Sequence, residues 1–137
     1  MKRIFTILLA AWLAGTAQAE SLDWFQTKVT PLTALCQEET GSNKDDILKV
    51  VNRHEPDTRE SQCLLACVYR RLGGMTHTGM ATREELRDSL LELYRDSEYK
   101  QSKVEAIIDH CGPQVALQPD VCCMAKKLFD CIKENVY

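Results

Sequence analysis

The stretch "DVCCMAKKLFDC", residues 120–131, contains two adjacent cysteines and a third at its end. Its apolar residues recur at helical spacing, and at about 100° per residue they fall on one face of a helix. With the next apolar position included, these residues are Val121, Met124, Ala125, Leu128 and Ile132. The stretch therefore predicts an amphipathic helix that buries this apolar stripe.

The cysteines of this helix face different directions. Cys122 and Cys131 flank the apolar stripe on opposite sides, whereas Cys123 lies on the polar face among lysines and acidic residues. The whole chain has seven cysteines, so one is left over if the others pair. Cys123 is the candidate for the unpaired thiol. A disulfide between two chains and reshuffling with Cys122 are the alternatives.

The first residues predict the compartment. Lys2 and Arg3 give a positive start, an apolar run follows, and small residues at Ala17 and Ala19 match a cleavage site. The apolar run is shorter than the roughly 20 residues of a membrane span, which argues against an anchor. We therefore expect a signal peptide at residues 1–19 and one secreted domain at residues 20–137. Secretion also favours disulfides, because the compartment is oxidising.

The overall charge argues against some partners. The formal net charge is −3 at pH 7, and removal of the basic start makes the remaining chain more acidic. Nucleic acids and anionic membrane surfaces attract basic faces, so neither is expected as a partner. No later apolar stretch approaches the length of a membrane span, so no membrane insertion is expected.

Helical patterns recur along the rest of the chain, and alternating strand patterns do not. We therefore expect an all-α fold of about six short helices around a shared interior. The expected helices cover residues 22–38, 42–54, 57–74, 82–94 and 97–112, and the last begins near residue 119.

Local signals predict where these helices begin and end. Pro31 is expected to bend or break the first helix, and Gly112–Pro113 is expected to end the fifth. Two capping boxes are expected at helix starts, formed by Asp57 with Glu60 and by Thr82 with Glu85.

Helix geometry excludes two cysteine pairings. Cys63 and Cys67 lie on adjacent turns with Cβ atoms about 5–6 Å apart, whereas a disulfide needs about 3.5–4.5 Å. Cys122 and Cys131 project to opposite sides of their helix, more than about 13 Å apart along its axis. Each of these helices therefore presents its two cysteines to different neighbours, and geometry leaves several connectivities open.

Without Cys123, the cysteine spacing is C-x26-C-x3-C-x43-C-x10-C-x8-C, from Cys36 to Cys131. This framework closely resembles that of the insect odorant-binding proteins, the pheromone-binding and general odorant-binding superfamily. The x3 and x8 gaps are the specific part of the match, which covers nearly all of the chain after residue 19. The x43 gap is longer than in the common form, and Cys123 is an additional cysteine.

The resemblance implies a fold and a function. Proteins of this family are six-helix carriers that hold odorants, pheromones or other small hydrophobic molecules in an apolar cavity, and they are not enzymes. We therefore expect a small hydrophobic ligand, no cofactor and no metal. A membrane odorant receptor is a further candidate partner, and both a monomer and a homodimer are open. The resemblance implies the disulfides Cys36–Cys67, Cys63–Cys122 and Cys111–Cys131.

The candidate cavity residues are inward positions of the later helices and of one loop. Met75 and Met80, in the loop after the third helix, are candidates to gate the entrance because methionine adapts to varied shapes. A solid core would show the same helical stripes, so ordinary packing is the alternative for every position. The other candidates are Val68, Tyr69, Leu72, Leu86, Leu90, Leu93, Tyr94, Met124, Ala125 and Leu128.

Several other functions are alternatives to the carrier. A secreted phospholipase A2 needs a His–Asp pair and a glycine-rich calcium loop. Lys126 and Lys127 stand where its histidine would be sought, and the sequence has no such loop, so this enzyme is not expected. A zinc site is not expected, because C-x3-C spacing and secretion favour disulfides. The same framework also serves carriers or scavengers of lipids and amines outside olfaction, but Asp88 and Glu92 lie off the leucine stripe, which argues against amines. A secreted interaction protein is the third class.

Overall fold

The structure is a computed structural model, and it describes residues 23–136. The predicted signal peptide at residues 1–19 lies outside the described residues, as does Tyr137. The described residues form helices without a β-sheet, so the expected all-α fold is confirmed. The helices are α2 (Trp24–Thr40), α3 (Lys44–Val51), α4 (Arg59–Arg71), α5 (Arg83–Leu93), α6 (Glu98–Ser102), α7 (Val104–Ala116) and α8 (Val121–Val136).

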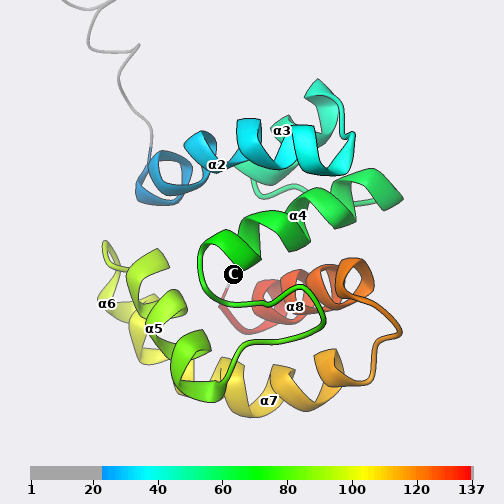
Figure 1. The fold of residues 1–137 in the computed structure, drawn as a ribbon. Coiled ribbons are helices and arrows are strands. Elements are labelled where there is room, and N and C mark those ends of the chain that lie inside the picture. Colours follow the sequence, from blue (N-terminus) through cyan, green and yellow to red (C-terminus); the bar gives the residue numbers. More distant parts are fainter. Residues whose placement is uncertain (1–22, 137) are drawn as a thin grey trace, which may run out of the picture.

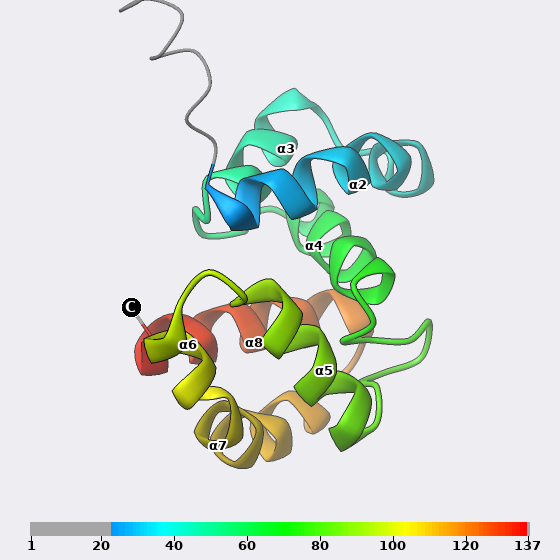
Figure 2. The ribbon, with the colours of Figure 1, turned by 90° about the vertical axis from the view of Figure 1, so that its left-hand side faces the viewer.

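Two helices, α4 and α8, form the centre of the domain and make the most extensive interhelical contact in its described part. In Figure 1, α2 and α3 cover α4 on one side, and α7 packs against α8 on the other. Figure 2 shows α5 and α6 together with α7, on the side of the domain away from α3. Helices far apart in the sequence therefore meet along α4 and α8.

The interior consists of two clusters of buried side chains. One cluster lies between α5, α7 and α8 and includes Leu90, Ile107 and Leu128. The other lies between α2, α3 and α4 and includes Val29 and Leu64. Each cluster buries the apolar stripe of several helices, which is the main favourable contribution to folding.

The predicted stripe of α8 faces both clusters. Ala125, Leu128 and Ile132 are buried, and Val121 and Met124 are half-buried. Ala125 belongs to the cluster around α4, whereas Leu128 and Ile132 belong to the cluster around α7. Helix α8 thus connects the two parts of the interior.

Three disulfides link four helices in series, α2 to α4, α4 to α8 and α8 to α7. They are the three pairs that the resemblance implies, and neither of the geometrically excluded pairs is bonded. The bonded pairs are Cys36–Cys67, Cys63–Cys122 and Cys111–Cys131.

Cys123 is the free cysteine of residues 23–136, and it is half-buried. Its backbone N–H donates to Oδ1 of Asp120 at 2.9 Å, and Nη1 of Arg59 lies 3.6 Å from its Sγ atom. Arg59 also pairs with Asp120 at 2.9 Å, and this hydrogen bond lowers the pKa of the Asp120 carboxyl. The thiol is therefore covered by a charged pair at the start of α8.

The helix starts show one correct and one wrong cap prediction. Thr82 and Glu85 form the expected capping box at α5. The box expected from Asp57 and Glu60 is wrong, because Thr58 caps α4 and its partner is Ser61. Asp57 instead accepts a hydrogen bond from Lys49 at 2.6 Å, so its side chain is turned toward α3.

Neither proline interrupts its helix, so the helix end expected at Gly112–Pro113 is wrong and Pro31 does not break the first helix. Pro31 lies within α2, and Pro113 lies within α7, which continues to Ala116. Proline leaves the carbonyl four residues earlier without its helical partner. Here those carbonyls belong to Thr27 and Asp109, which are exposed, so water can take the place of the missing N–H.

The helix expected over residues 97–112 is divided into α6 and α7 at Lys103. The hydroxyl of Ser102 donates to the carbonyl of Tyr99 at 2.6 Å, so it competes for a backbone acceptor at the end of α6. The spacing of apolar residues did not reveal this break, because the stripe of α7 begins only at Val104.

The length of the loop that each disulfide closes predicts its contribution to stability. Replacing Cys63 and Cys122 together by alanine should lower the free energy of unfolding by about 4 kcal/mol, and replacing Cys111 and Cys131 by about 3 kcal/mol. The difference arises because the closed loops span 59 and 20 residues. Urea unfolding of the two double variants measures both values. A smaller loss for the Cys63–Cys122 variant would contradict this interpretation.

Candidate ligand-binding site

A mostly apolar pocket of about 250 Å³ opens at one end of the α4–α8 pair. Five parts of the chain contribute to it: α2, the end of α3 with the following loop, α4, the end of α5 and α8. Its lining residues are Phe25, Val50, Arg53, His54, Pro56, Leu65, Tyr69, Leu93, Tyr94, Phe129, Ile132 and Lys133. The pocket is therefore bounded by side chains from both buried clusters and from the loop before α4.

The inner wall of the pocket is apolar. Leu65 of α4, Leu93 of α5 and Ile132 of α8 are all at least nine-tenths buried. Tyr94 is 3% exposed, and Phe129 is half-buried. Such a wall favours burial of an apolar guest, because about 25 cal/mol is gained for each Å² of apolar surface removed from water.

One side of the pocket is formed by an unusual turn after α3. Arg53 has φ +55°, the left-handed region that non-glycine residues rarely adopt. Its guanidinium lies 2.8 Å from the carboxylate of Asp23 and 4.7 Å from the centre of the Phe25 ring. The turn is thereby fastened to the first turn of α2. A side-chain hydrogen bond from Gln26 to Asn52 at 3.2 Å adds a second connection.

The first turn of α2 is also fastened to the end of α5. The indole N–H of Trp24 donates to the carbonyl of Glu92 at 2.9 Å, and Lys28 pairs with the Glu92 carboxylate at 3.4 Å. Residues 93 and 94, next along the chain, line the pocket. The position of α2 therefore sets the distance between two of the pocket walls.

The sequence and the fold of this chain both match known proteins. The family model for the PBP/GOBP family matches residues 18–135. The chain belongs to the PBP/GOBP family. The expected resemblance to insect odorant-binding proteins is thus confirmed.

Relatives of this PBP/GOBP chain include proteins from two insects. General odorant-binding protein 19d of Drosophila melanogaster is 24% identical over 101 residues, which cover 74% of this chain and 67% of that protein. A pheromone binding protein from the cockroach Leucophaea maderae, solved in complex with the fluorescent reporter ANS, is 29% identical. It superposes with a TM-score of 0.73 over 83% of this chain and 97% of the cockroach chain.

A third comparison supports the fold alone. The odorant-binding protein dmelOBP28a from Drosophila melanogaster is 22% identical and superposes with a TM-score of 0.61. The match covers 80% of this chain and 90% of that one. The arrangement of helices around α4 and α8 is therefore shared with a solved insect pheromone binding protein and a solved insect odorant-binding protein.

Three of the predicted cavity residues line the pocket: Tyr69, Leu93 and Tyr94. The others lie in the packed interior or beside it. Met75 and Met80 pair with each other in an isolated antiparallel bridge, and neither lines this pocket. The remaining predicted residues contribute to the two clusters and are Val68, Leu72, Leu86, Leu90, Met124, Ala125 and Leu128.

Nine lining residues were not predicted. Phe25, Arg53 and His54 come from segments that only tertiary packing brings to α4 and α8, so no local periodicity could identify them. Phe129 could have been predicted from the sequence, because it is a large aromatic residue beside the apolar stripe of α8 rather than on it. The others are Val50, Pro56, Leu65, Ile132 and Lys133.

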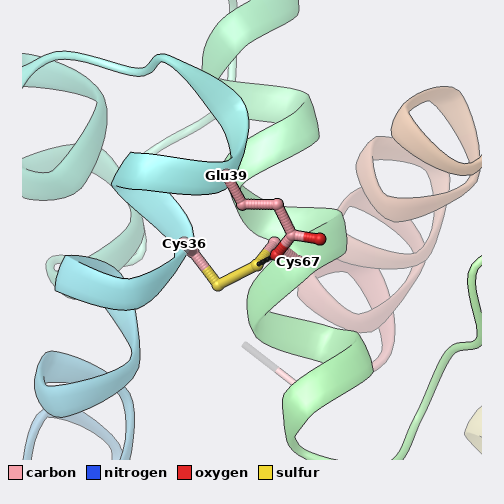
Figure 3. Close-up of side chains that lie close together, drawn as sticks. All are labelled: Cys36, Glu39 and Cys67. Carbon is pink, nitrogen blue, oxygen red and sulfur yellow. Dashed lines mark hydrogen bonds between the residues drawn. A yellow bond between two sulfur atoms is a disulfide. The ribbon is translucent and has the colours of Figure 1, made fainter.

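A separate grouping lies at the Cys36–Cys67 disulfide. Figure 3 shows Glu39 directed at this bond, with its Oε2 atom 2.9 Å from Sγ of Cys67. The contact is not a thiol hydrogen bond, because a disulfide sulfur carries no proton. Arg70 donates to both carboxylate oxygens of Glu39 at 2.6 Å. The carboxylate is thus held as an ion pair.

The same grouping has the spacing of a metal site but not the chemistry. One ligand atom each from Cys36, Glu39 and Cys67 lies within 4.8 Å of the others. Metal ions bind thiolates, and neither sulfur is a thiolate while the disulfide is intact. We therefore assign the grouping to the contact between α2 and α4.

The ion pair between Asp23 and Arg53 predicts a pH dependence. The hydrogen bond from Arg53 lowers the pKa of Asp23 below its ordinary value, so the pair stabilises the fold above that value and is lost as pH falls through the folded-state pKa. The variant Asp23→Asn keeps a good helix cap but removes the charge. At neutral pH it should be less stable than the wild type by at most about 1 kcal/mol, because the pair is partly exposed.

Urea unfolding of both proteins at neutral pH and near pH 2 measures this effect. The difference in stability should become smaller at the lower pH, because protonation of the wild-type carboxyl removes the charge that the variant lacks. A difference that stays the same at both pH values would show that the charge of Asp23 is not its source.

Proposed function

We propose that this member of the PBP/GOBP family is a secreted carrier that binds a small hydrophobic molecule in the pocket and transports it through aqueous fluid. The observation that carries the proposal is an apolar pocket of about 250 Å³ at the junction of the two buried clusters, in a chain of this family. The complex of the cockroach pheromone binding protein with ANS supports it, because that protein superposes over most of this chain.

The proposal includes the organisation of the whole chain. We propose a signal peptide at residues 1–19 and a carrier domain at residues 20–137. Every helix within residues 23–136 is too short or too polar to cross a membrane. A membrane odorant receptor is the proposed partner that receives the ligand, and the protein acts as a monomer or a homodimer.

The physical argument connects the pocket with the disulfides. An interior that gives up volume to a guest loses packing stability. Three disulfides at typically about 2–4 kcal/mol each can offset that loss. They connect α2, α4, α8 and α7, and three of these helices contribute side chains to the pocket.

The same fold could serve a carrier of lipids or amines outside olfaction. The pocket lining contains no aspartate and no glutamate, so an amine would lack an anionic partner there. The lining therefore favours apolar ligands and lipids over amines.

Filling the pocket tests the carrier function. Leu65→Trp places a larger side chain in the inner wall and should weaken binding of the neutral probe N-phenyl-1-naphthylamine about tenfold or more, since it removes the guest's space. Leu117→Trp is the control, because Leu117 is 84% exposed and lies outside the pocket. Fluorescence titration of the folded proteins measures both.

Ile132→Trp provides a second pocket-filling variant if Leu65→Trp does not fold. Circular dichroism establishes that each variant keeps its helices. Unchanged probe binding in a folded pocket-filling variant would exclude this pocket as the binding site, and absence of probe binding to the wild type would contradict the carrier function.

A further inference from the structure

Apart from the phenols of Tyr69 and Tyr94, which are neutral at pH 7, the ionisable side chains that line the pocket are all nitrogen bases. Arg53, His54 and Lys133 line it, and no carboxylate does so. This is unexpected in a chain whose formal net charge is −3. The charge at the pocket is therefore opposite in sign to the charge of the protein as a whole.

Three acidic residues close in sequence to lining residues are paired with other cations, whereas Glu134, next to Lys133, is exposed. Glu55 and Asp130 both contact Lys126, at 3.1 and 2.9 Å. Asp57 contacts Lys49 at 2.6 Å, and the hydrogen bond from Lys49 lowers the pKa of Asp57. These carboxylates are consequently engaged away from Lys133.

The three nitrogen-bearing side chains differ in their partners. Arg53 is bound by Asp23 and lies over the Phe25 ring. Within residues 23–136, the side chains of Lys133 and His54 take part in no ion pair or hydrogen bond. Lys133 is therefore a cation at the apolar pocket without a counter-ion among the described residues.

We propose that the ligand is an amphiphile with one anionic head group, of the fatty-acid class. Its chain lies against the inner wall, and its carboxylate binds the ammonium of Lys133 with His54 beside it. This inference rests on the proposed carrier function and adds the chemical class of the ligand. The wall residues are Leu65, Tyr69, Leu93, Phe129 and Ile132.

The chemistry of the head group and of the apolar chain explains why the pocket should prefer an anionic amphiphile to a neutral or a cationic one. An ammonium–carboxylate contact is a charge-assisted hydrogen bond, which is stronger than a bond between neutral groups. Lys133 and His54 are exposed, so water and salt screen the contact in part. A neutral alcohol with the same chain gains the apolar contact but not the ionic one. An alkylammonium places a like charge beside Lys133 and Arg53, and such repulsion discriminates against it.

Competition among ligands with one shared chain tests the inference. Decanoate, 1-decanol and decylammonium are each titrated against bound N-phenyl-1-naphthylamine at neutral pH and low salt, below their micellar concentrations. Decanoate should bind about tenfold more tightly than 1-decanol, and decylammonium should bind most weakly. Added salt should weaken decanoate binding more than decanol binding, because only the former is ionic.

The variant Lys133→Gln assigns the effect to one residue. It should reduce the affinity for decanoate about tenfold, so that the preference over 1-decanol disappears. Lys127→Gln is the matched control, because Lys127 lies on the same helix but does not line the pocket. It should keep the full preference for decanoate.

The outcomes separate the two proposals. If 1-decanol and decanoate bind equally and Lys133→Gln changes neither, the anionic ligand class is wrong although the carrier function stands. A preference for decanoate that survives Lys133→Gln would overturn the assignment to Lys133, whatever Lys127→Gln does. If none of the ligands displaces the probe, the carrier function itself fails.

Discussion

Two helices, α4 and α8, carry most of the packing in this domain, and the Cys63–Cys122 disulfide joins them directly. Helix α8 contributes buried side chains to both clusters, and α4 contributes its buried side chains to the cluster around Val29 and Leu64. The other two disulfides attach α2 to α4 and α7 to α8. Because these covalent links run in series through four helices, the distances between helices do not depend on a solid core alone. The pocket lies between the two clusters, where the helices must stay apart without a solid core between them.

The pocket also depends on weaker contacts at its edge. Arg53 adopts a left-handed conformation, and its ion pair with Asp23 and its contact with Phe25 compensate for the strain of that turn. Trp24 connects the same end of α2 to α5 through the carbonyl of Glu92. The first turn of α2 thus contacts both the turn after α3 and the end of α5, which form two of the pocket walls. These contacts are exposed and individually weak, so the edge of the pocket is easier to open than the disulfide-linked centre.

The sequence predicted the parts of this structure that depend on local or covalent constraints. Wheel positions on one helix placed Cys123 outside the disulfide framework, and the capping box of Thr82 is a contact across one turn. The cap at α4 was misplaced by one residue because Asp57 binds Lys49, a partner eight positions away that no cap pattern includes. Most of the pocket lining could not be predicted for the same reason, since residues such as Arg53 reach it only through packing of separate segments. Helical stripes identify buried positions but do not distinguish those that pack against protein from those that border a hollow.

The central claim is that covalently linked helices keep an apolar hollow open between two packed clusters. A crystal structure of the oxidised protein under xenon pressure tests it most directly, because xenon enters preformed apolar cavities without needing a specific polar partner. We predict xenon density between Leu65, Leu93 and Ile132, with the helices at the same positions as in xenon-free crystals. A site filled by its own side chains, with no xenon bound there, would contradict this account.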